Sequence, residues 1–189
     1  MDELSDDDLM RLFCDGHKEA FGALFARHHG CVYGFARMML HRPEAAADVL
    51  QETFLAALRG AERYLGDGRF RPWLLRIARN LCVNRLQAER ALRAVMSAGR
   101  MGMDQERWAS REPTPAAAAE QADERERIRL AMAELPERQR EALALYALRE
   151  MTYQDIAEAM EAPLNTVKTL IRRARAGLAA KLTGDHDAP

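Results

Sequence analysis

The sequence has few of the features that mark membrane, secreted or disulfide-bonded proteins. Its longest wholly apolar runs last only a few residues, too short for a transmembrane span. The amino terminus is acidic, where a signal peptide would be basic and then apolar. The three cysteines (Cys14, Cys31 and Cys82) stand far apart with no C-x-x-C pair, which argues against a disulfide framework. We therefore expect a soluble, cytoplasmic protein with no direct membrane insertion.

Aromatic residues and strand signals are also scarce, and this favours helices. Only 6% of the 189 residues are aromatic, whereas 48% are hydrophobic, too many for a disordered chain. Alanine, leucine and arginine dominate, and all three are strong helix formers. No phosphate-binding glycine loop, H-E-x-x-H or G-x-S-x-G motif is present, so we expect neither an enzyme nor a cofactor. The expected fold class is all-α.

The net charge of −1 conceals an uneven distribution of charges. Residues 1–15 carry six acids and one base, residues 61–90 carry seven arginines, and residues 165–181 carry five bases and no acid. Two separate basic segments on a nearly neutral chain indicate an anionic partner that is contacted at two places. Composition alone leaves open the alternative that both segments are ordinary solvated helix faces.

Glycine and proline divide the chain into two small helical domains. We expect two helices within residues 8–40 on either side of Gly16, and further helices over 43–59, 70–90, 121–135, 136–149, 152–160 and 164–182. Residues 94–121 contain glycines, two prolines and no clear apolar stripe, which is typical of an irregular connector. The prediction is a domain over 1–92, a flexible linker over 93–120 and a second domain over 121–189.

The last two expected helices have the pattern of a helix-turn-helix. Thr152 and Asp155 suit a capping box, and a tight turn at 161–163 follows the first helix. The second helix has an apolar stripe from Val167 to Leu178 and an opposite face that is small, polar and basic, as the major groove requires. Its candidate DNA-binding residues are Asn165 (the expected N-cap), Thr166, Lys168, Thr169 and Arg172, with Arg173 and Arg175 suited to phosphates.

Three sequence blocks resemble one family. ELPERQREALALYALREMTYQDIAEAMEAPLNTVKTLIRRARAGL looks like region 4 of the extracytoplasmic-function (ECF, group IV) sigma factors of the sigma-70 family, which reads the −35 promoter element. DVLQETFLAALRG and FRPWLLRIARNLCVNRL resemble sigma regions 2.2 and 2.3–2.4, in the right order and at the right separation. The sequence departs from the family pattern at Glu161 and Asn165, where glycine is frequent. A left-handed Glu161 would cost on the order of 1 kcal/mol.

The resemblance implies a sigma factor that binds core RNA polymerase and directs promoter-specific initiation of transcription. In the family, the loop 65–70 and the helix after it capture a flipped base of the −10 element and help to melt the duplex. On that helix we expect Trp73, Leu74, Ile77, Ala78 and Leu81 to face the core. Arginines suit the phosphates of the separated strand and amides suit its bases. The candidate −10 residues are Tyr64, Phe70, Arg76, Arg79, Asn80, Val83 and Asn84.

An acidic helix face is the candidate contact with the polymerase. On the helix 45–59 we expect Leu50, Thr53, Phe54, Ala57 and Leu58 to face the core, and Asp48, Gln51, Glu52 and Leu55 to face outward. A single exposed leucine is normal, so an ordinary surface is the alternative. In the family this helix docks on the basic clamp helices of the largest polymerase subunit, which fits an acidic rim around an apolar centre. The other partners implied are promoter DNA and an anti-sigma factor that wedges between the domains.

Two other classes of protein and a metal site compete with this interpretation. A one-component helix-turn-helix regulator with a helical sensor domain explains residues 121–189 equally well, but not the basic, amide-bearing helix 70–87. An interaction protein of the anti-sigma type leaves the basic recognition face without a role. Zinc or redox sensing is suggested by Cys14, His17, His28, His29 and Cys31. Such residues are usually packing or surface residues, and we expect no metal site.

Overall fold

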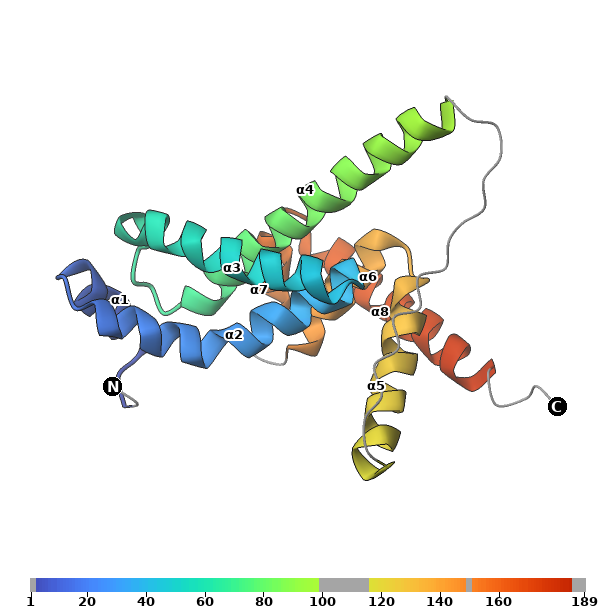
Figure 1. Cartoon of the computed structure of the whole chain (residues 1–189), viewed down its shortest axis with the longest axis horizontal. Coiled ribbons are helices and arrows are strands. Elements are labelled where there is room, and N and C mark those ends of the chain that lie inside the picture. The colour runs from blue at the N-terminus through green and yellow to red at the C-terminus, as the bar shows by residue number, and fades with distance from the viewer. Residues whose placement is uncertain (1–2, 99–115, 149–150, 185–189) are drawn as a thin grey trace.

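The computed structural model describes residues 3–98, 116–148 and 151–184, which contain helices and no strand. The elements are α1 (Asp6–Cys14), α2 (Lys18–Leu40), α3 (Pro43–Gly60), the 3-10 turn η1 (Ala61–Arg63), α4 (Phe70–Ala98), α5 (Ala116–Ala133), α6 (Glu137–Ala147), α7 (Tyr153–Ala159) and α8 (Leu164–Gly184). Figure 1 shows α1 to α4 in one group and α5 to α8 in another. The all-α prediction is confirmed. We call residues 3–98 the N-terminal half and residues 116–184 the C-terminal half.

Local capping signals set several helix ends where the sequence predicts them. Thr152 and Asp155 form a capping box at the start of α7, because each side chain bonds the backbone N–H of the other residue. Ser5 and Asp8 form the same motif at the start of α1, which begins at Asp6, two residues before the predicted start. Gly16 has a φ of +99°, a conformation that side chains disfavour, and it separates α1 from α2.

The N-cap predicted for the recognition helix is wrong. Helix α8 begins at Leu164, and the carbonyl of Pro163 accepts hydrogen bonds from the N–H groups of Thr166 (2.9 Å) and Val167 (3.1 Å). Asn165 therefore lies inside the first turn. The cause is the preceding turn, in which Glu161 adopts a left-handed φ of +49° and brings the chain into the helix directly after the proline.

Both ends of the predicted linker are helical. Helix α4 continues past residue 92 to Ala98, and α5 already begins at Ala116. The rest of the predicted linker, residues 99–115, lies outside the described residues. The predicted helices 70–90 and 121–135 were therefore too short at these ends. The prediction relied on an apolar stripe, which the sequence lacks here, whereas its many alanines favour a helix without one.

The N-terminal half packs α2, α3 and α4 around one core. The buried side chains of α4 are Phe70, Leu74, Leu75, Ala78 and Cys82, whereas Trp73, Ile77 and Leu81, which were predicted to face the core, are only half-buried. On α3, Leu58 is 36% exposed rather than buried. Helix α4 contacts α2 and α3 and also α7. Its covered surface is therefore wider than the single stripe that periodicity predicts.

An aromatic cluster fixes the start of α4. The ring of Phe70 is buried and its centroid lies 5.3 Å from that of His28, 5.6 Å from that of Tyr64 and 5.7 Å from that of Trp73. Gly60 provides space for this cluster, because a Cβ there would lie 3.3 Å from the ring of Trp73. The cluster ties the loop between η1 and α4 to helix α2.

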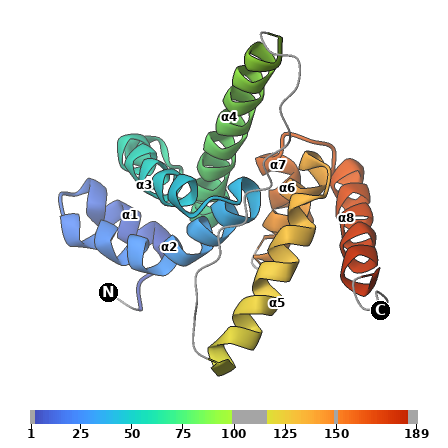
Figure 2. The same cartoon turned by 45° about the vertical axis from the view of Figure 1, so that its right-hand side comes forward.

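The C-terminal half has the predicted helix-turn-helix, with α6 and α5 packed against α8. Val167, Ile171 and Ala174 are buried on the inner side of α8, as the apolar stripe predicts. The two halves also pack directly on each other, through α4 with α7 and through α2 with α5 and α6 (Figure 2). Both predicted helical regions are present, and we call the packing of one on the other, as the described residues show it, the closed arrangement.

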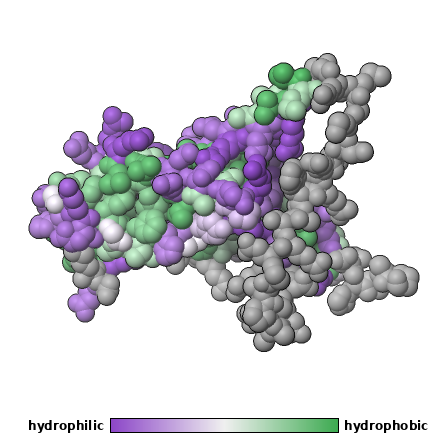
Figure 3. Space-filling model, in the orientation of Figure 1, coloured by the Kyte–Doolittle hydropathy of each residue, from purple (hydrophilic) through white to green (hydrophobic). Residues whose placement is uncertain are grey.

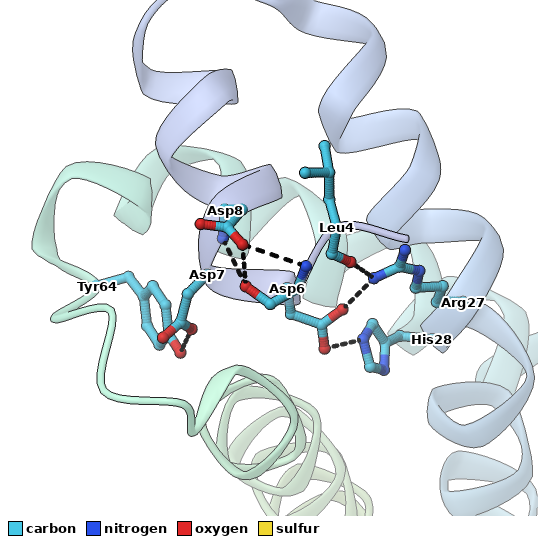
Figure 4. Close-up of polar contacts among 8 residues, drawn as sticks. Leu4, Asp6, Asp7, Asp8, Arg27, His28 and Tyr64 are labelled. Atoms are coloured by element: carbon cyan, nitrogen blue, oxygen red, sulfur yellow. Dashed lines mark hydrogen bonds and ion pairs between the residues drawn. The ribbon is translucent and has the colours of Figure 1, made fainter. Parts of the chain in front are cut away.

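Beneath α1, Asp6 and His28 form a largely buried ion pair (Figure 4). His28 Nε2 lies 2.7 Å from Asp6 Oδ2, and Arg27 donates a 3.0 Å hydrogen bond to the other carboxylate oxygen. Burial opposes the charge on His28, but its hydrogen bond to Asp6 and the nearby Cys31 raise its pKa to about 9. The same hydrogen bond lowers the pKa of Asp6.

We predict that Asp6→Asn lowers the free energy of unfolding by about 1–3 kcal/mol at pH 6, because it removes a charged partner of a buried group. His28 has a raised pKa, so the contribution of its charge is complete below its ordinary pKa of 6.5 and is lost as the pH rises toward 9. The difference between wild type and variant should therefore narrow from pH 6.5 to pH 9 in urea unfolding. A constant difference over that range would contradict a charged His28.

Candidate nucleic-acid and polymerase interfaces

The outer face of α8 is an exposed basic surface. Lys168, Arg172, Arg173 and Arg175 are exposed, and none of them has an acidic partner among the described residues. Asn165 and Thr166 are exposed beside them in the first turn. Thr169 is half-buried, and its hydroxyl donates a 2.9 Å hydrogen bond to the carbonyl of Asn165. The face can thus offer free guanidinium groups to an anion, while Thr169 keeps only its acceptor lone pairs and methyl group for a ligand.

The candidate −10 residues are divided between the surface and the interior. Arg76, Asn80 and Asn84 are exposed on α4, and Val83 is half-buried. Phe70, predicted to contact DNA, is instead 1% exposed inside the aromatic cluster. Tyr64 is half-buried, with its hydroxyl bonded to Asp7. The structure therefore brings the three polar residues of α4 to one surface but withdraws the Phe70 ring from it.

Arg79 was predicted to lie on the outer face of α4, and the structure places it against the C-terminal half. Its Nε donates a 2.6 Å hydrogen bond to Glu141 of α6, whose side chain is 1% exposed. Its Nη1 donates to Asn80 Oδ1 at 3.0 Å. Helical periodicity correctly places Arg79 on the side of α4 that faces away from the N-terminal core. It cannot show that Glu141 of α6 covers this side, because α6 belongs to the other half.

Arg69, at the end of the loop before α4, is also held by the C-terminal half. Its Nη2 lies 2.6 Å from Asp155 and 2.7 Å from Glu158, both on α7. These pairs border a cavity of about 180 Å³ between the loop and α7, which Tyr64 and Trp73 also line. The hydrogen bonds to the two acids raise the pKa of Arg69. The sequence reasoning missed Arg69 as a site residue, although it lies in the loop that the family resemblance indicates.

A second junction between the halves surrounds His41, at the end of α2. Arg140 of α6 lies 2.8 Å from His41 Nε2, and Arg37 and Arg129 donate hydrogen bonds to the His41 carbonyl. Burial and the three nearby arginines lower the pKa of His41 to about 4, against the weaker influence of Glu126. The imidazole is therefore neutral near pH 7, and Nε2 accepts a hydrogen bond from Arg140.

The outward face of α3 has the predicted composition and one feature that the sequence did not show. Asp48, Gln51, Glu52 and Leu55 are all exposed, Leu55 by 43%. Arg85 of α4 lies 3.2 Å from Asp48 and 2.6 Å from Glu52, which neutralises part of the acidic rim.

The apolar part of this surface is larger than one leucine. Phe25 is 41% exposed and packs on Phe54 of α3, and Leu58 is 36% exposed. Figure 3 shows a hydrophobic area over the part of the molecule formed by the first three helices. Sequence periodicity had assigned Leu58 to the core, so it missed this extension.

The cysteine and histidine residues suggested for metal binding are engaged separately. His28 pairs with Asp6, His29 Nδ1 lies 3.0 Å from the carbonyl of Ala26, and Cys31 donates to the carbonyl of His28. Across residues 3–98, 116–148 and 151–184, no three His, Cys, Asp or Glu side chains are placed to hold a metal ion.

Comparison with known proteins assigns both halves to one family. The model of Sigma-70 region 2 matches residues 24–92, and that of Sigma-70 region 4 matches residues 125–178. The RNA polymerase sigma factor CarQ of Myxococcus xanthus is 35% identical over 152 residues, which are 78% of this chain and 80% of the relative. The ECF RNA polymerase sigma-E factor of Haemophilus influenzae is 32% identical over 179 residues, 92% of this chain and 93% of the relative. The chain belongs to the ECF sigma factors of the sigma-70 family.

Solved structures agree with this assignment. CnrH, determined in complex with the cytosolic domain of CnrY, matches with a TM-score of 0.68 and 27% identity, covering 97% of this sigma factor and 99% of that chain. RpoE of Bartonella quintana, determined in complex with the anti-sigma factor NepR, matches with a TM-score of 0.67 at 20% identity over 86% and 96% of the two chains, which supports the fold.

Family membership decides between the classes of protein considered from the sequence. A one-component regulator explains only the C-terminal half, whereas the region 2 match covers most of the N-terminal half. In the described part of this sigma factor, no helix is both long and apolar enough to cross a membrane.

Proposed function

We propose that this sigma factor binds core RNA polymerase through α3, reads the −35 element with α8 and opens the −10 element with the loop 65–70 and α4. The observation that supports this most is the pair of basic surfaces on different halves, each within a region that matches the corresponding sigma model. The free guanidinium groups of α8 suit a duplex with intact base edges. The arginine and amides exposed on α4 suit phosphates and unpaired bases.

In this proposal the polymerase contact is the surface formed by Asp48, Gln51, Glu52 and Leu55, extended by Phe25 and Leu58. An apolar centre with acidic residues around it suits a basic helical partner, since the apolar area supplies affinity and the charges orient the partner. The clamp helices of the largest polymerase subunit are the proposed partner. Arg85 keeps Asp48 and Glu52 in place until that partner arrives.

The closed arrangement is the proposed state of the free protein. Arg69 and Arg79 are bound to acids of the C-terminal half, so each must leave a carboxylate partner before it binds a phosphate. Polymerase, which engages both halves, favours the open form. An anti-sigma factor is the proposed antagonist, because both structural relatives were determined in complex with a partner protein, which for RpoE is the anti-sigma factor NepR.

We predict that the free protein binds promoter duplex weakly at physiological salt and that adding core RNA polymerase makes binding tight and sequence-specific. The net charge of −1 gives little general attraction to DNA, and the arginines of α4 and its loop are occupied. Gel-shift titrations with and without polymerase measure the difference. Tight, specific binding by the protein alone would refute the proposed function.

The same titration measures how much the closed arrangement weakens DNA binding by the free protein. Glu158→Gln removes one exposed acid that faces Arg69, and it should strengthen DNA binding by the free protein by no more than about fivefold, as is typical of exposed ion pairs. Glu44→Gln on α3 is the matched control: it removes the same charge from an exposed residue outside the interface between the halves.

We predict that Arg172→Ala changes the base preference within the −35 element, by about 1–3 kcal/mol for a lost base contact. Arg173→Ala should instead weaken transcription from all promoters alike and reduce its salt dependence, because a phosphate contact carries no sequence information. Transcription from a series of −35 variants compares the two. If Arg172→Ala leaves the preference unchanged, α8 does not read bases through this residue.

We predict that Leu55→Asp abolishes association with core RNA polymerase and leaves the fold intact, because the side chain is already 43% exposed. Leu92→Asp is the matched control, with the same change at a residue of α4 that is 62% exposed and lies outside the proposed interface. Pull-down of core polymerase gives the binding, and circular dichroism checks the fold. Recovery of polymerase at the wild-type level would remove α3 from the interface.

A further inference from the structure

The carboxylate of Asp7 joins the two ends of the loop before α4. It accepts a 2.5 Å hydrogen bond from the hydroxyl of Tyr64 and a 2.7 Å hydrogen bond from the backbone N–H of Gly68. The backbone N–H of Arg69 in turn donates to the Tyr64 hydroxyl oxygen at 3.1 Å. Figure 4 shows Asp7 extending from α1 to Tyr64. One side chain of the N-terminal helix thus determines how this loop lies.

The other contacts of the loop lie at its two ends, in the aromatic cluster around Tyr64 and in the Arg69 ion pairs with α7. Between these ends Leu65 is 87% exposed, and Gly66 and Gly68 have φ values of +63° and +75°, in the region that favours glycine. Only Phe70, at the start of α4, is buried. Burial and the bond to Asp7 raise the pKa of Tyr64, so its hydroxyl remains a donor at neutral pH. A loop of exposed residues and glycines needs an external acceptor to keep one conformation.

Helix α1 is itself placed firmly enough to serve as that support. Leu9 and Met10 are buried in the core, Asp6 pairs with His28, and Asp8 completes the capping box with Ser5. The three consecutive aspartates therefore have three different partners. The family match begins at residue 24, so Asp7 lies outside the matched region.

We infer that Asp7 is a positioning residue for −10 recognition, because its two hydrogen bonds hold the loop 65–69 in the conformation that receives an unpaired base. The inference rests on the proposed function of that loop. The inference also gives the acidic amino terminus a second role. From the charge pattern alone, this segment would only oppose DNA binding. The carboxylate of Asp7 is directed at loop donors and orders a DNA-binding surface.

The test compares Asp7→Asn with Asp6→Asn, the same chemical change on the preceding residue. An asparagine at residue 7 keeps one acceptor oxygen but turns an NH₂ group toward the second donor, so one end of the loop is released. We expect the ratio of transcription from the preferred −10 sequence to that from single-base variants to fall by about tenfold, the effect of one hydrogen bond to a charged acceptor. The −35 preference should not change.

The assay uses the full chain with core RNA polymerase and a promoter selected by the wild-type holoenzyme from a library. Each variant is measured on duplex templates and on templates opened in advance over the −10 region. Asp6→Asn should lower the free energy of unfolding without changing −10 discrimination, which separates positioning from stability. Tyr64→Phe removes the hydroxyl that Asp7 binds, keeps the aromatic ring, and should reproduce the loss of discrimination.

The possible results separate the inference from the function on which it rests. If the wild type directs transcription and Asp7→Asn discriminates −10 variants as well as Asp6→Asn does, the positioning role is overturned while the proposed function stands. If Asp7→Asn is unfolded by circular dichroism, Tyr64→Phe decides the question by the same ratio. If the wild-type protein directs no transcription with core polymerase, the proposed function falls and this inference falls with it.

Discussion

The pairing of Arg79 with Glu141 is the constraint around which the two halves are arranged. The carboxylate is 1% exposed and the guanidinium 12%, so each charge has lost most of its water and depends on the other. A buried pair of this kind contributes little net stability compared with apolar packing, but removing one partner is costly. It therefore acts mainly on the relative position of the halves: α6 must lie where Glu141 reaches α4, and the Arg69 pairs and the His41 junction are further contacts between the halves.

Helix type, order and most boundaries could be predicted from the sequence because they depend on local signals. The capping box of Thr152 and Asp155 and the stripe from Val167 to Ala174 are read within a few residues of chain. The N-cap prediction for α8 was wrong because a left-handed Glu161 brings the chain into the helix directly after Pro163, which places Asn165 inside the first turn. Phe70 was misplaced because a short motif cannot show that three other rings surround it.

The candidate surfaces show the same limit. The polar residues of α3, α4 and α8 are exposed much as periodicity predicts, because each face is defined within one helix. Arg69 and Arg79 were not expected to be covered, since their partners lie 62 to 89 residues away and only folding brings them together. The role of Asp7 could not be predicted from the sequence. Asp6, Asp7 and Asp8 are identical side chains in a row, and they differ only in the hydrogen-bond partners that each one reaches in the fold.

The neutral His41 determines what kind of change the closed form responds to. Because the pKa of His41 lies near 4, and because the pKa of Asp155 is lowered and that of its partner Arg69 is raised, these contacts gain or lose no proton across the physiological pH range. Acidity is thus a poor trigger for separating the halves. Salt ions and polyanions are better suited to separate the halves, since they compete with the carboxylates for the same guanidinium groups. In the proposed opening, each of these guanidinium groups therefore exchanges a carboxylate of the C-terminal half for a phosphate of the nucleic acid.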